Sequence, residues 1–420
     1  MRKFLFVLGV VLLVFFAPLN TSLSQLSGDY YIPKGTHPQG FNTLAEAIAA
    51  LNSQGASGTV RFLIDGDLSE TGANLKIDRP DLSATNNLVI KPAPGKTPTI
   101  TITGCASSTN SDTSIRNAGL TIRKTNYVTI DGSNTDGGIT RDLTFVMNDG
   151  TNGRHAIHIF GDADHITIKN VKIRYNAIGS TTSGNGIFVN GQSVGSAAGV
   201  SDYISIINCE IGEDSPTLVG PFFGISFTGA SGAGWYCSNG VIANNVVYGR
   251  TRGINLFWHN GPGDVMNIYG NIIGVVNAPG GVAIWGILHQ NYAGTLNFYN
   301  NKINKMVQTT TGTQGIYGFG TLNGAAGAAV VNLYNNFFGG DFDHIGTGTP
   351  ASIDVISFQD APTGATCNVY YNTVVLNNMT KTATGRMTCI RLAGTWTKNV
   401  KNNIFINKKT GTSIAYCILM

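Results

Sequence analysis

One short pattern recurs through most of this chain and limits what the chain can fold into. Its clearest copy is the segment 329–341, AVVNLYNNFFGGD, where polar and apolar residues alternate, stop at an Asn pair and then resume. Alternation with a period of two is typical of a β-strand, because successive side chains point to opposite faces. The Asn pair marks a bend, since Asn tolerates left-handed backbone geometry. The pattern predicts a unit of strand, bend and strand.

The bend recurs at intervals of 26 to 38 residues after Gly150. Its copies are Asn170, Asn208, Asn245, Asn271, Asn301, Asn336, Asn372 and Asn403. A second short strand precedes each bend, and the segment between the two strands varies in length. A fixed unit with variable loops indicates a solenoid. Because the unit lacks helical periodicity, we predict an all-β, single-stranded parallel β-helix with coils stacked at the interstrand spacing of ~4.8 Å.

The composition agrees with stacked coils. Charged residues make up 12% of the chain, about half the usual ~25%. Like charges near 5 Å apart repel by on the order of 1 kcal/mol even in water, so a stack of equivalent positions disfavours charge. Stacked Asn amides can instead hydrogen-bond to one another, at about 1 kcal/mol net for each bond. The net charge of +4 is small and dispersed, which argues against nucleic acid as a partner.

The N-terminus predicts export. Arg2-Lys3 precedes an apolar run from Phe4 to Ala17, and small residues follow before Gln25. We therefore interpret residues 1–24 as a secretory signal peptide, removed from a protein that is secreted or held at a bacterial cell surface. The apolar run is shorter than the ~20 residues that a bilayer requires, and no later run could span a membrane.

Residues 25–58 are predicted to form an N-terminal cap. Thr43 and Glu46 form a capping box, and the apolar residues from Leu44 to Leu51 share one face of a helix over 43–52. Such a helix could cover the open end of a solenoid, where strand groups are unpaired. Residues 59–420 are assigned to the β-helix. Because 413–420 look like the first strand of a further coil, we expect truncation at the C-terminus.

Six cysteines lie in this exported chain, so disulfides are allowed. Cys389 and Cys417 occupy matching places in successive units, where stacked strands would bring their Cα atoms within disulfide range. The alternative is that the thiols are buried as small hydrophobic side chains. No CxxC pair or Cys/His cluster is present, so we predict no metal.

The repeat resembles a known family. The strand G-I-x-apolar followed by apolar-x-N-N-x-apolar resembles the right-handed parallel β-helix repeats of the pectate lyase-like superfamily, over roughly residues 59–420. The segments 43–62 and 128–133 look like exported β-helix proteins of Gram-negative bacteria that use type IX secretion. The resemblance implies a right-handed helix in a superfamily of polysaccharide lyases, glycoside hydrolases, phage tailspikes and adhesins.

No complete catalytic motif of that superfamily is present. Asn134-Thr135-Asp136 matches one polygalacturonase-like element, but the paired D-D, G-H-G and R-I-K elements are missing. The W-I-D-H and R-x-P-x-x-R runs of pectate lyase-like enzymes are missing too. The segment 131–138 departs from calcium-loop spacing, so calcium has no support and no cofactor is predicted. We assign no catalytic residue and leave open whether the chain is an enzyme.

The densest ionisable group lies at residues 154–165. Its members are Arg154, His155, His158, Asp162, Asp164 and His165. A glycosidase needs two carboxylates about 5–9.5 Å apart, and Asp162 and Asp164 could point the same way on an extended segment. The alternative is a turn between two strands, since turns are rich in Asp.

The outward side of the second strand predicts a binding face. If the Ile residues of these strands point inward, their neighbours point outward in two columns. The first column is His158, Phe188, Ser226, Asn255, Tyr317, Ser357 and Arg391, and the second is Phe160, Asn190, Thr228, Phe257, Phe319, Gln359 and Ala393. Aromatic rings among amides and hydroxyls suit sugars. The alternative is that inserted loops bury these rings as a satellite core.

The predicted substrate-binding residues are His158, Phe160, Asn190, Asn255, Phe257, Trp258, His259 and Trp285. The favoured function is that of an exported, non-catalytic and monomeric protein that binds a polysaccharide or another surface polymer along its long face. The first alternative is a polysaccharide lyase or glycoside hydrolase with acidic residues in the variable loops. The second is a structural adhesin segment.

Overall fold

A computed structural model defines the fold. The described residues are 24–178, 183–190, 199, 201–214, 219–229, 237–257, 259, 261–276, 278, 282–308, 314–322, 329–344, 352–359, 364–377, 386–408 and 414–420. The predicted signal peptide over 1–24 therefore lies outside them, apart from its last residue. Within these ranges, no helix is long and apolar enough to cross a membrane.

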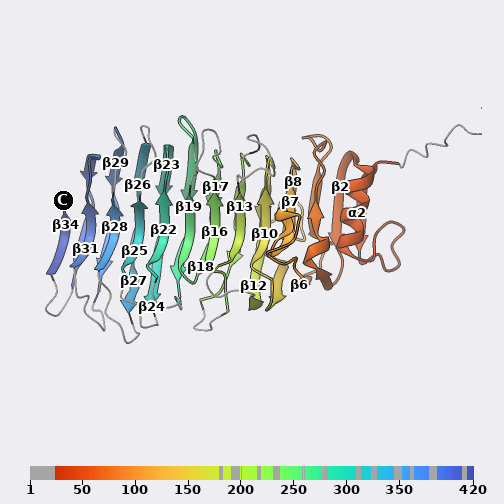
Figure 1. The fold of residues 1–420 in the computed structure, drawn as a ribbon, viewed down its shortest axis with the longest axis horizontal. Helices are drawn as coiled ribbons and strands as arrows, with labels where there is room; N and C mark the ends of the chain where they lie inside the picture. Colours follow the sequence, from red (N-terminus) through yellow and green to blue (C-terminus); the bar gives the residue numbers. More distant parts are fainter. Residues whose placement is uncertain are drawn as a thin grey trace, which may run out of the picture.

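Three parallel β-sheets wind around one core and form a solenoid (Figure 1). Each coil contributes one strand to each sheet in turn.

Sheet A contains β1 (Leu26–Ile32), β2 (Ala56–Ile64), β5 (Leu88–Pro92), β8 (Val128–Asp131), β11 (Thr167–Lys169), β14 (Ser205–Ile207), β17 (Val241–Ala243), β20 (Val265–Tyr269), β23 (Gly294–Tyr299), β26 (Ala329–Tyr334), β29 (Thr366–Tyr370) and β32 (Thr397–Lys401). Sheet B contains β3 (Leu68–Thr71), β6 (Thr99–Thr103), β9 (Leu143–Asp149), β12 (Val171–Ile178), β15 (Glu210–Ile211), β18 (Val246–Gly249), β21 (Ile272–Val275), β24 (Lys302–Gln308), β27 (Phe337–His344), β30 (Thr373–Leu376) and β33 (Ile404–Asn407). Sheet C contains β4 (Lys76–Ile77), β7 (Ala118–Arg123), β10 (His155–Phe160), β13 (Asn185–Asn190), β16 (Phe223–Thr228), β19 (Arg252–Phe257), β22 (Ile284–Gln290), β25 (Ile316–Leu322), β28 (Ser352–Phe358), β31 (Arg386–Leu392) and β34 (Ile414–Leu419). The predicted parallel β-solenoid is confirmed.

The bend asparagines lie in file, but in two adjacent files rather than one. We call Asn245, Asn271, Asn301, Asn336, Asn372 and Asn403 the ladder asparagines. Each hydrogen-bonds to the next, and all except the half-buried Asn403 are buried. The Nδ2-to-Oδ1 distances are 3.0 Å for Asn245–Asn271, 2.9 Å for Asn271–Asn301, 3.2 Å for Asn301–Asn336, 2.9 Å for Asn336–Asn372 and 3.0 Å for Asn372–Asn403. Each Oδ1 also accepts the backbone N–H of the preceding ladder residue, at 2.8–3.0 Å.

Asn170 and Asn208 do not belong to that ladder. The register pairs Lys169 with Ile207 and Ile207 with Ala243, so both asparagines align with the residue before Asn245. That position has positive φ in every coil from Asn170 to the end: it is 60° at Asn170, 52° at Asn208 and 58° at Asn244. The sequence pattern merged the left-handed bend residue with the ladder residue that follows it, because each of the two positions is Asn in most of these coils.

The predicted alignment of residues between coils is also wrong at one place in sheet C. The inward file pairs Ile254 with Ile287 and Ile287 with Phe319, so Phe319 takes the place predicted for Ile316. Glycine fixes this register, since a Cβ on Gly253 would lie 2.8 Å from the Gly286 carbonyl oxygen and one on Gly286 would lie 2.5 Å from that of Gly318. Gly315-Ile316 has the same Gly-Ile sequence as the other strands, although Gly318 is the glycine that occupies the equivalent position. Phe319 therefore points inward, and Tyr317 joins a different outward file.

The predicted helix is confirmed as α2 (Leu44–Gln54). Thr43 accepts a hydrogen bond from the backbone N–H of Glu46 at 3.1 Å, and Glu46 in turn accepts one from the N–H of Asn42 at 2.9 Å. The helix buries Leu44, Ala47, Ile48 and Leu51, as the spacing predicted. It lies at the end of the molecule that carries β2 (Figure 1). Two short 3-10 turns, η1 (Gly72–Asn74) and η2 (Thr113–Ile115), complete the helical structure of the described residues.

Cys389 and Cys417 lie on the adjacent strands β31 and β34, between paired residues. All six cysteines are free thiols, and all except Cys417 are buried. Burial raises the pKa of the Cys389 thiol to about 12. The predicted alternative of a buried free thiol therefore holds for Cys389, whereas Cys417 is free and exposed.

Replacing Asn301 by Ala should destabilise the fold by about 3 kcal/mol, because two buried donors of Asn271 lose their shared acceptor. Chemical denaturation measures this loss. Asn297→Ala is the matched control, since Asn297 also bonds its neighbouring asparagines but on the half-buried outer side of β23. Its loss should stay below about 1 kcal/mol. Equal losses in the two variants would contradict the role given to the buried ladder.

Candidate functional site

The predicted binding residues lie mostly on the outward side of sheet C, which runs along the middle of the view in Figure 1. Five of them are nonetheless buried: His158, Phe160, Asn255, His259 and Trp285. Asn190 and Phe257 are partly exposed, and Trp258 lies outside the described residues. The prediction that these binding residues are exposed is therefore wrong for the five buried ones. Their part in binding remains a prediction.

Packing between neighbouring coils explains this burial. The His158 ring stacks on Phe188 with centroids 5.0 Å apart, and its Nδ1 lies 2.8 Å from the Ser114 carbonyl oxygen. Trp285 stacks on Tyr317 at 3.9 Å. A Cβ on Gly320 would lie 2.1 Å from the Trp285 ring, so the indole covers a position that has no side chain. These outward residues form a second apolar layer over sheet C.

His259 and His289 form a buried pair with ring centroids 4.7 Å apart. Burial lowers the pKa of His259 to about 3 and that of His289 well below its usual value, so both rings are neutral. His289 shares its strand position with inward-facing Leu256. Of the predicted site residues, His259 is therefore part of the interior.

The outward side of sheet A carries a more exposed set of polar and aromatic side chains. We call the outward side of β5 to β32 the sheet A platform. Two of its files follow the register from coil to coil. The middle file is Val89, Thr129, Thr167, Ser205, Val241, Asn267, Asn297, Asn332, Asn368 and Asn399. The tyrosine file is Tyr269, Tyr299, Tyr334 and Tyr370.

The asparagines of the middle file bond to one another along the solenoid. The Nδ2-to-Oδ1 distances are 2.9 Å for Asn297–Asn267, 2.8 Å for Asn332–Asn297, 2.7 Å for Asn368–Asn332 and 2.8 Å for Asn399–Asn368. The tyrosine rings stack beside them, with centroids 5.0 Å apart for Tyr269–Tyr299 and 4.8 Å for Tyr299–Tyr334. All of these Asn and Tyr side chains are half-buried.

A cleft of about 520 Å³ opens at the other end of the platform. One wall is a stack of Tyr127, His165 and Tyr203, with ring centroids 4.7 and 4.9 Å apart. All three residues have positive φ, of 55–56°, which turns their side chains out at the start of each sheet A strand. The floor is built from Val89, Thr129, Thr167 and Ser205, and Asn87 completes the lining.

A second cleft, of about 400 Å³, lies beside β2 and β5 and holds the Asn134-Thr135-Asp136 element. Lys91 and Arg61 both contact the Asp136 carboxylate. These cations lower the pKa of Asp136, so it remains ionised and is unsuited to donate a proton. The structure gives this element the role of an ion-pair partner.

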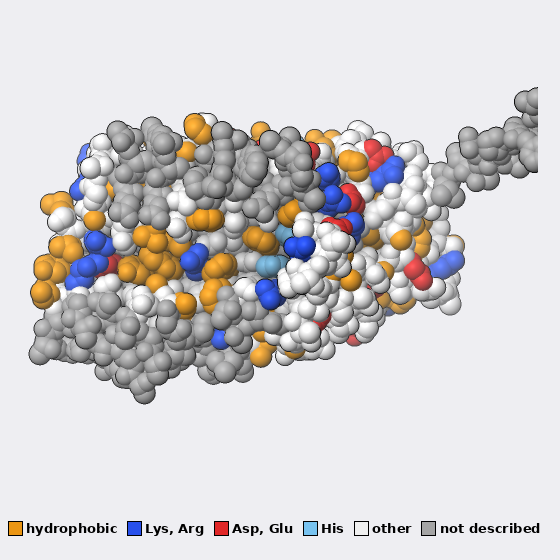
Figure 2. Space-filling model, viewed as in Figure 1, with side chains coloured by type: hydrophobic (Ala, Val, Ile, Leu, Met, Phe, Trp, Pro, Cys, Tyr) orange, Lys and Arg blue, Asp and Glu red, His pale blue; other side chains and the backbone are white. Residues whose placement is uncertain are grey.

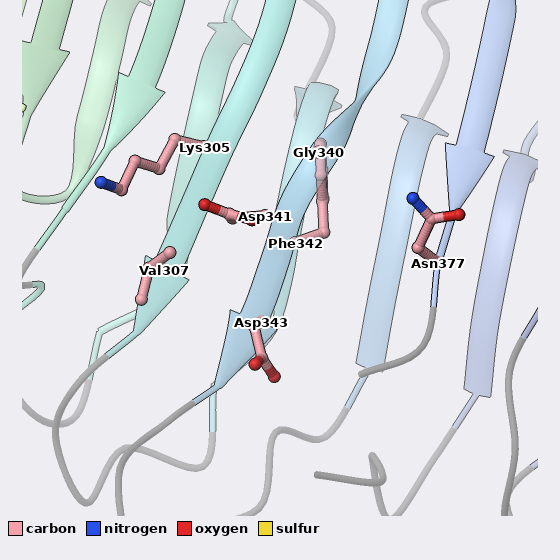
Figure 3. Close-up of a pocket in the computed structure, with 7 residues that line it drawn as sticks. All are labelled: Lys305, Val307, Gly340, Asp341, Phe342, Asp343 and Asn377. Atoms are coloured by element: carbon pink, nitrogen blue, oxygen red, sulfur yellow. The ribbon is translucent and has the colours of Figure 1, made fainter. Parts of the chain in front are cut away.

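A third cleft, of about 420 Å³, lies on sheet B (Figure 3). Asp341 and Asp343 alternate with Phe342 on β27, and Lys305 and Val307 come from β24. Phe342 is buried, and Lys305 pairs with Asp214. The lining includes no other aromatic residue, so it offers a sugar no ring face.

The acidic group predicted near Asp162 and Asp164 lies at the corner between sheets C and A. Asp164 accepts the backbone N–H of Asp202 at 2.7 Å, and Asp202 accepts that of Ser238 at 2.8 Å. Burial and the neighbouring carboxylates Asp164 and Asp264 raise the pKa of Asp202 to about 6. Neither Asp164 nor Asp202 lines the adjacent cleft. Across the described part of the chain, no group of three or more His, Cys, Asp or Glu side chains is placed to hold a metal ion.

The chain is similar to several solved structures. One is the GH136 lacto-N-biosidase from Eubacterium ramulus, at 11% identity and TM-score 0.45, covering 93% of this chain and 68% of that chain. Another is PfbA, a surface adhesin of Streptococcus pneumoniae, at 12% identity and TM-score 0.37, covering 89% and 88%. A third is the A-module of the Azotobacter vinelandii mannuronan C-5 epimerase AlgE4, at 11% identity and TM-score 0.38, covering 92% and 99%. No family profile and no curated protein sequence matches the chain.

The sheet A platform was not among the predicted sites, although the sequence carries a signal for it. The triplet Asn-x-Tyr recurs directly before the bend, at 267–269, 297–299, 332–334 and 368–370. Alternation places the Asn and the Tyr on one face and the apolar residue between them on the other. The predicted binding face used only the outward residues of the sheet C strands, so it does not include these triplets.

The carboxylate of Asp202 should make stability depend on pH. Its pKa in the folded protein, about 6, exceeds the unfolded value near 3.8, so the protonated form is favoured by folding. This contribution is absent above pH 6 and grows as the pH falls from about 6 to about 4. Asp202→Asn should therefore raise the melting temperature at pH 7.5 and flatten its dependence on pH. Thermal unfolding of Asp162→Asn, which removes an exposed neighbouring carboxylate, provides the control. An unchanged pH profile in Asp202→Asn would contradict the assignment.

Proposed function

We propose that this chain is an exported, non-catalytic β-solenoid that binds a polysaccharide lying along the sheet A platform. The observation that carries the proposal is the continuity of the Asn and Tyr files across neighbouring coils on the outer side of one sheet. A polymer parallel to the solenoid axis would meet the same groups once in each coil.

The chemistry of these files suits hydroxyl-rich ligands. Each asparagine of the middle file from Asn297 to Asn399 uses one N–H in the bond to its neighbour, and an amide has a second N–H and further lone pairs. The stacked tyrosines cover one another's faces, so they present ring edges and phenol hydroxyls. Hydrogen bonds therefore dominate along the files. The Tyr203 side chain is 52% exposed, so this ring offers a face for stacking on a sugar.

Rigidity supports binding by many weak contacts. Side chains that already bond along a file lose little rotamer freedom when a ligand arrives, which lowers the cost of association. In this proposal the chain is monomeric, right-handed and closed at its N-terminal end by α2. The segment 1–24 serves as the secretory signal peptide, and the resemblance implies that export continues by the type IX route.

The paired variant Tyr299→Phe with Tyr334→Phe tests the platform. It removes two hydroxyls and keeps the ring stack, so folding should be unaffected while affinity for the bound polysaccharide falls severalfold. Affinity electrophoresis through gels that contain individual polysaccharides measures this change. Phe257→Ala, on sheet C, is the comparison. A loss of affinity in Phe257→Ala and none in the tyrosine variant would move the site to sheet C.

A second candidate function is glycoside cleavage or lyase activity. The observation that favours it is the raised pKa of Asp164, which burial causes, beside a cleft lined by aromatic rings. Release of oligosaccharides from the bound polysaccharide, lost in Asp164→Asn but kept in Tyr299→Phe with Tyr334→Phe, would establish this function in place of binding alone.

A further inference from the structure

Arg252, on the outward side of sheet C, is a charge that its surroundings do not balance. Its guanidinium lies over the Phe223 ring, 4.7 Å from the ring centre. Burial alone lowers the pKa of Arg252 to about 10, with no contribution from a carboxylate. The Arg252 side chain is half-buried, and a partly desolvated cation without a counter-charge is costly to the fold.

The nearby charges do not compensate Arg252. The strands of sheet C from β10 to β34 contain one carboxylate, Asp354, and it pairs with Arg386 at 2.7 Å. Between 179 and 413, the segments outside the described residues contain a single carboxylate in their sequence, Asp360. Figure 2 shows this side of the molecule, where apolar side chains and blue Lys and Arg side chains gather with few red carboxylates between them.

The guanidinium is held in place by a polar network. Arg252 donates to Oδ1 of Asn255, and Nδ2 of Asn255 donates to Oγ of Ser226 at 2.8 Å. The Ser226 hydroxyl lies 3.1 Å from that of Thr228. Asn255 and Ser226 are both buried, so their rotamers are fixed by packing. This support orients the Arg252 fork before any ligand binds.

We propose that Arg252 is the centre of an anion-binding subsite on sheet C that takes an oxyanion, either the carboxylate of an acidic sugar or a sulfate group. A guanidinium presents parallel N–H donors that match two oxygens of such a group. The flanking Phe223 ring adds an apolar wall suited to the carbon face of a sugar. This subsite lies on a different sheet from the platform, so it is independent of the proposed function.

Thermal unfolding of the full chain in three sodium salts tests the proposal, with glucuronate, sulfate and chloride compared at matched ionic strength. An anion that binds the folded state raises the melting temperature by mass action. We expect glucuronate, sulfate or both to raise it by a few degrees above chloride, and neutral glucose to have no effect. The larger of the two shifts identifies the source of the oxyanion.

The variant Arg252→Gln should abolish the anion-dependent shift, because it removes the guanidinium. Lys172→Gln, on the outer side of sheet B, and Tyr299→Phe with Tyr334→Phe should keep the full shift. Asp360→Asn should also leave it unchanged. An equal shift in Arg252→Gln and in the unmodified chain would overturn the proposal.

Discussion

The amide-to-amide hydrogen bond between successive coils is the interaction on which this structure depends. The bend of each coil places backbone N–H groups in an apolar interior, where they cannot hydrogen-bond to water. From Asn271 to Asn403, the side chain of the ladder asparagine in the next coil accepts the hydrogen bond from such an N–H group. Asn301, for example, accepts from Asn271 and donates to Asn336 and to the carbonyl of Ile268 at 2.9 Å. Because each bond needs its counterpart in the next coil, the ladder fixes the register of the coils from Asn245 to Asn403.

The same stacking determines what the outer surface can present. Equivalent positions repeat at the interstrand spacing, so residues that attract their own kind are retained and like charges are disfavoured. On sheet A this selection gives files of Asn and Tyr that bond or stack from coil to coil. On sheet C the outward residues differ between coils and pack into a second layer. Arg252 belongs to this layer, where its guanidinium lies over the Phe223 ring with no carboxylate beside it.

Much of the fold could be predicted from the sequence because the repeat is local. The strand alternation and the capping residues of α2 each depend on neighbours within a few positions. Registers across coils depend on contacts that a local pattern does not contain. Asn208 and Gly315 both fit the repeat pattern in sequence. In the structure Asn208 lies one residue before the ladder position, and Gly315 lies three residues before the glycine position that Gly318 occupies.

The candidate site was harder to predict than the fold. Alternation gives the direction of a side chain, but it does not say whether a neighbouring coil covers it. Trp285 points outward as expected and is nevertheless buried against Tyr317. The Asn and Tyr side chains of the sheet A triplets remain half-buried. The asparagines hydrogen-bond to one another and the rings of Tyr269, Tyr299 and Tyr334 stack, which leaves hydroxyls and amides at the surface.

Affinity as a function of ligand length tests the central claim most directly. Calorimetric titration with oligomers of increasing length, cut from whichever polysaccharide binds, would report how much of the molecule the ligand contacts. A polymer lying along stacked coils predicts affinity that rises with each added sugar until the ligand spans the platform. Affinity that is already maximal for a mono- or disaccharide would show a single local pocket and contradict a binding face built by coil-to-coil repetition.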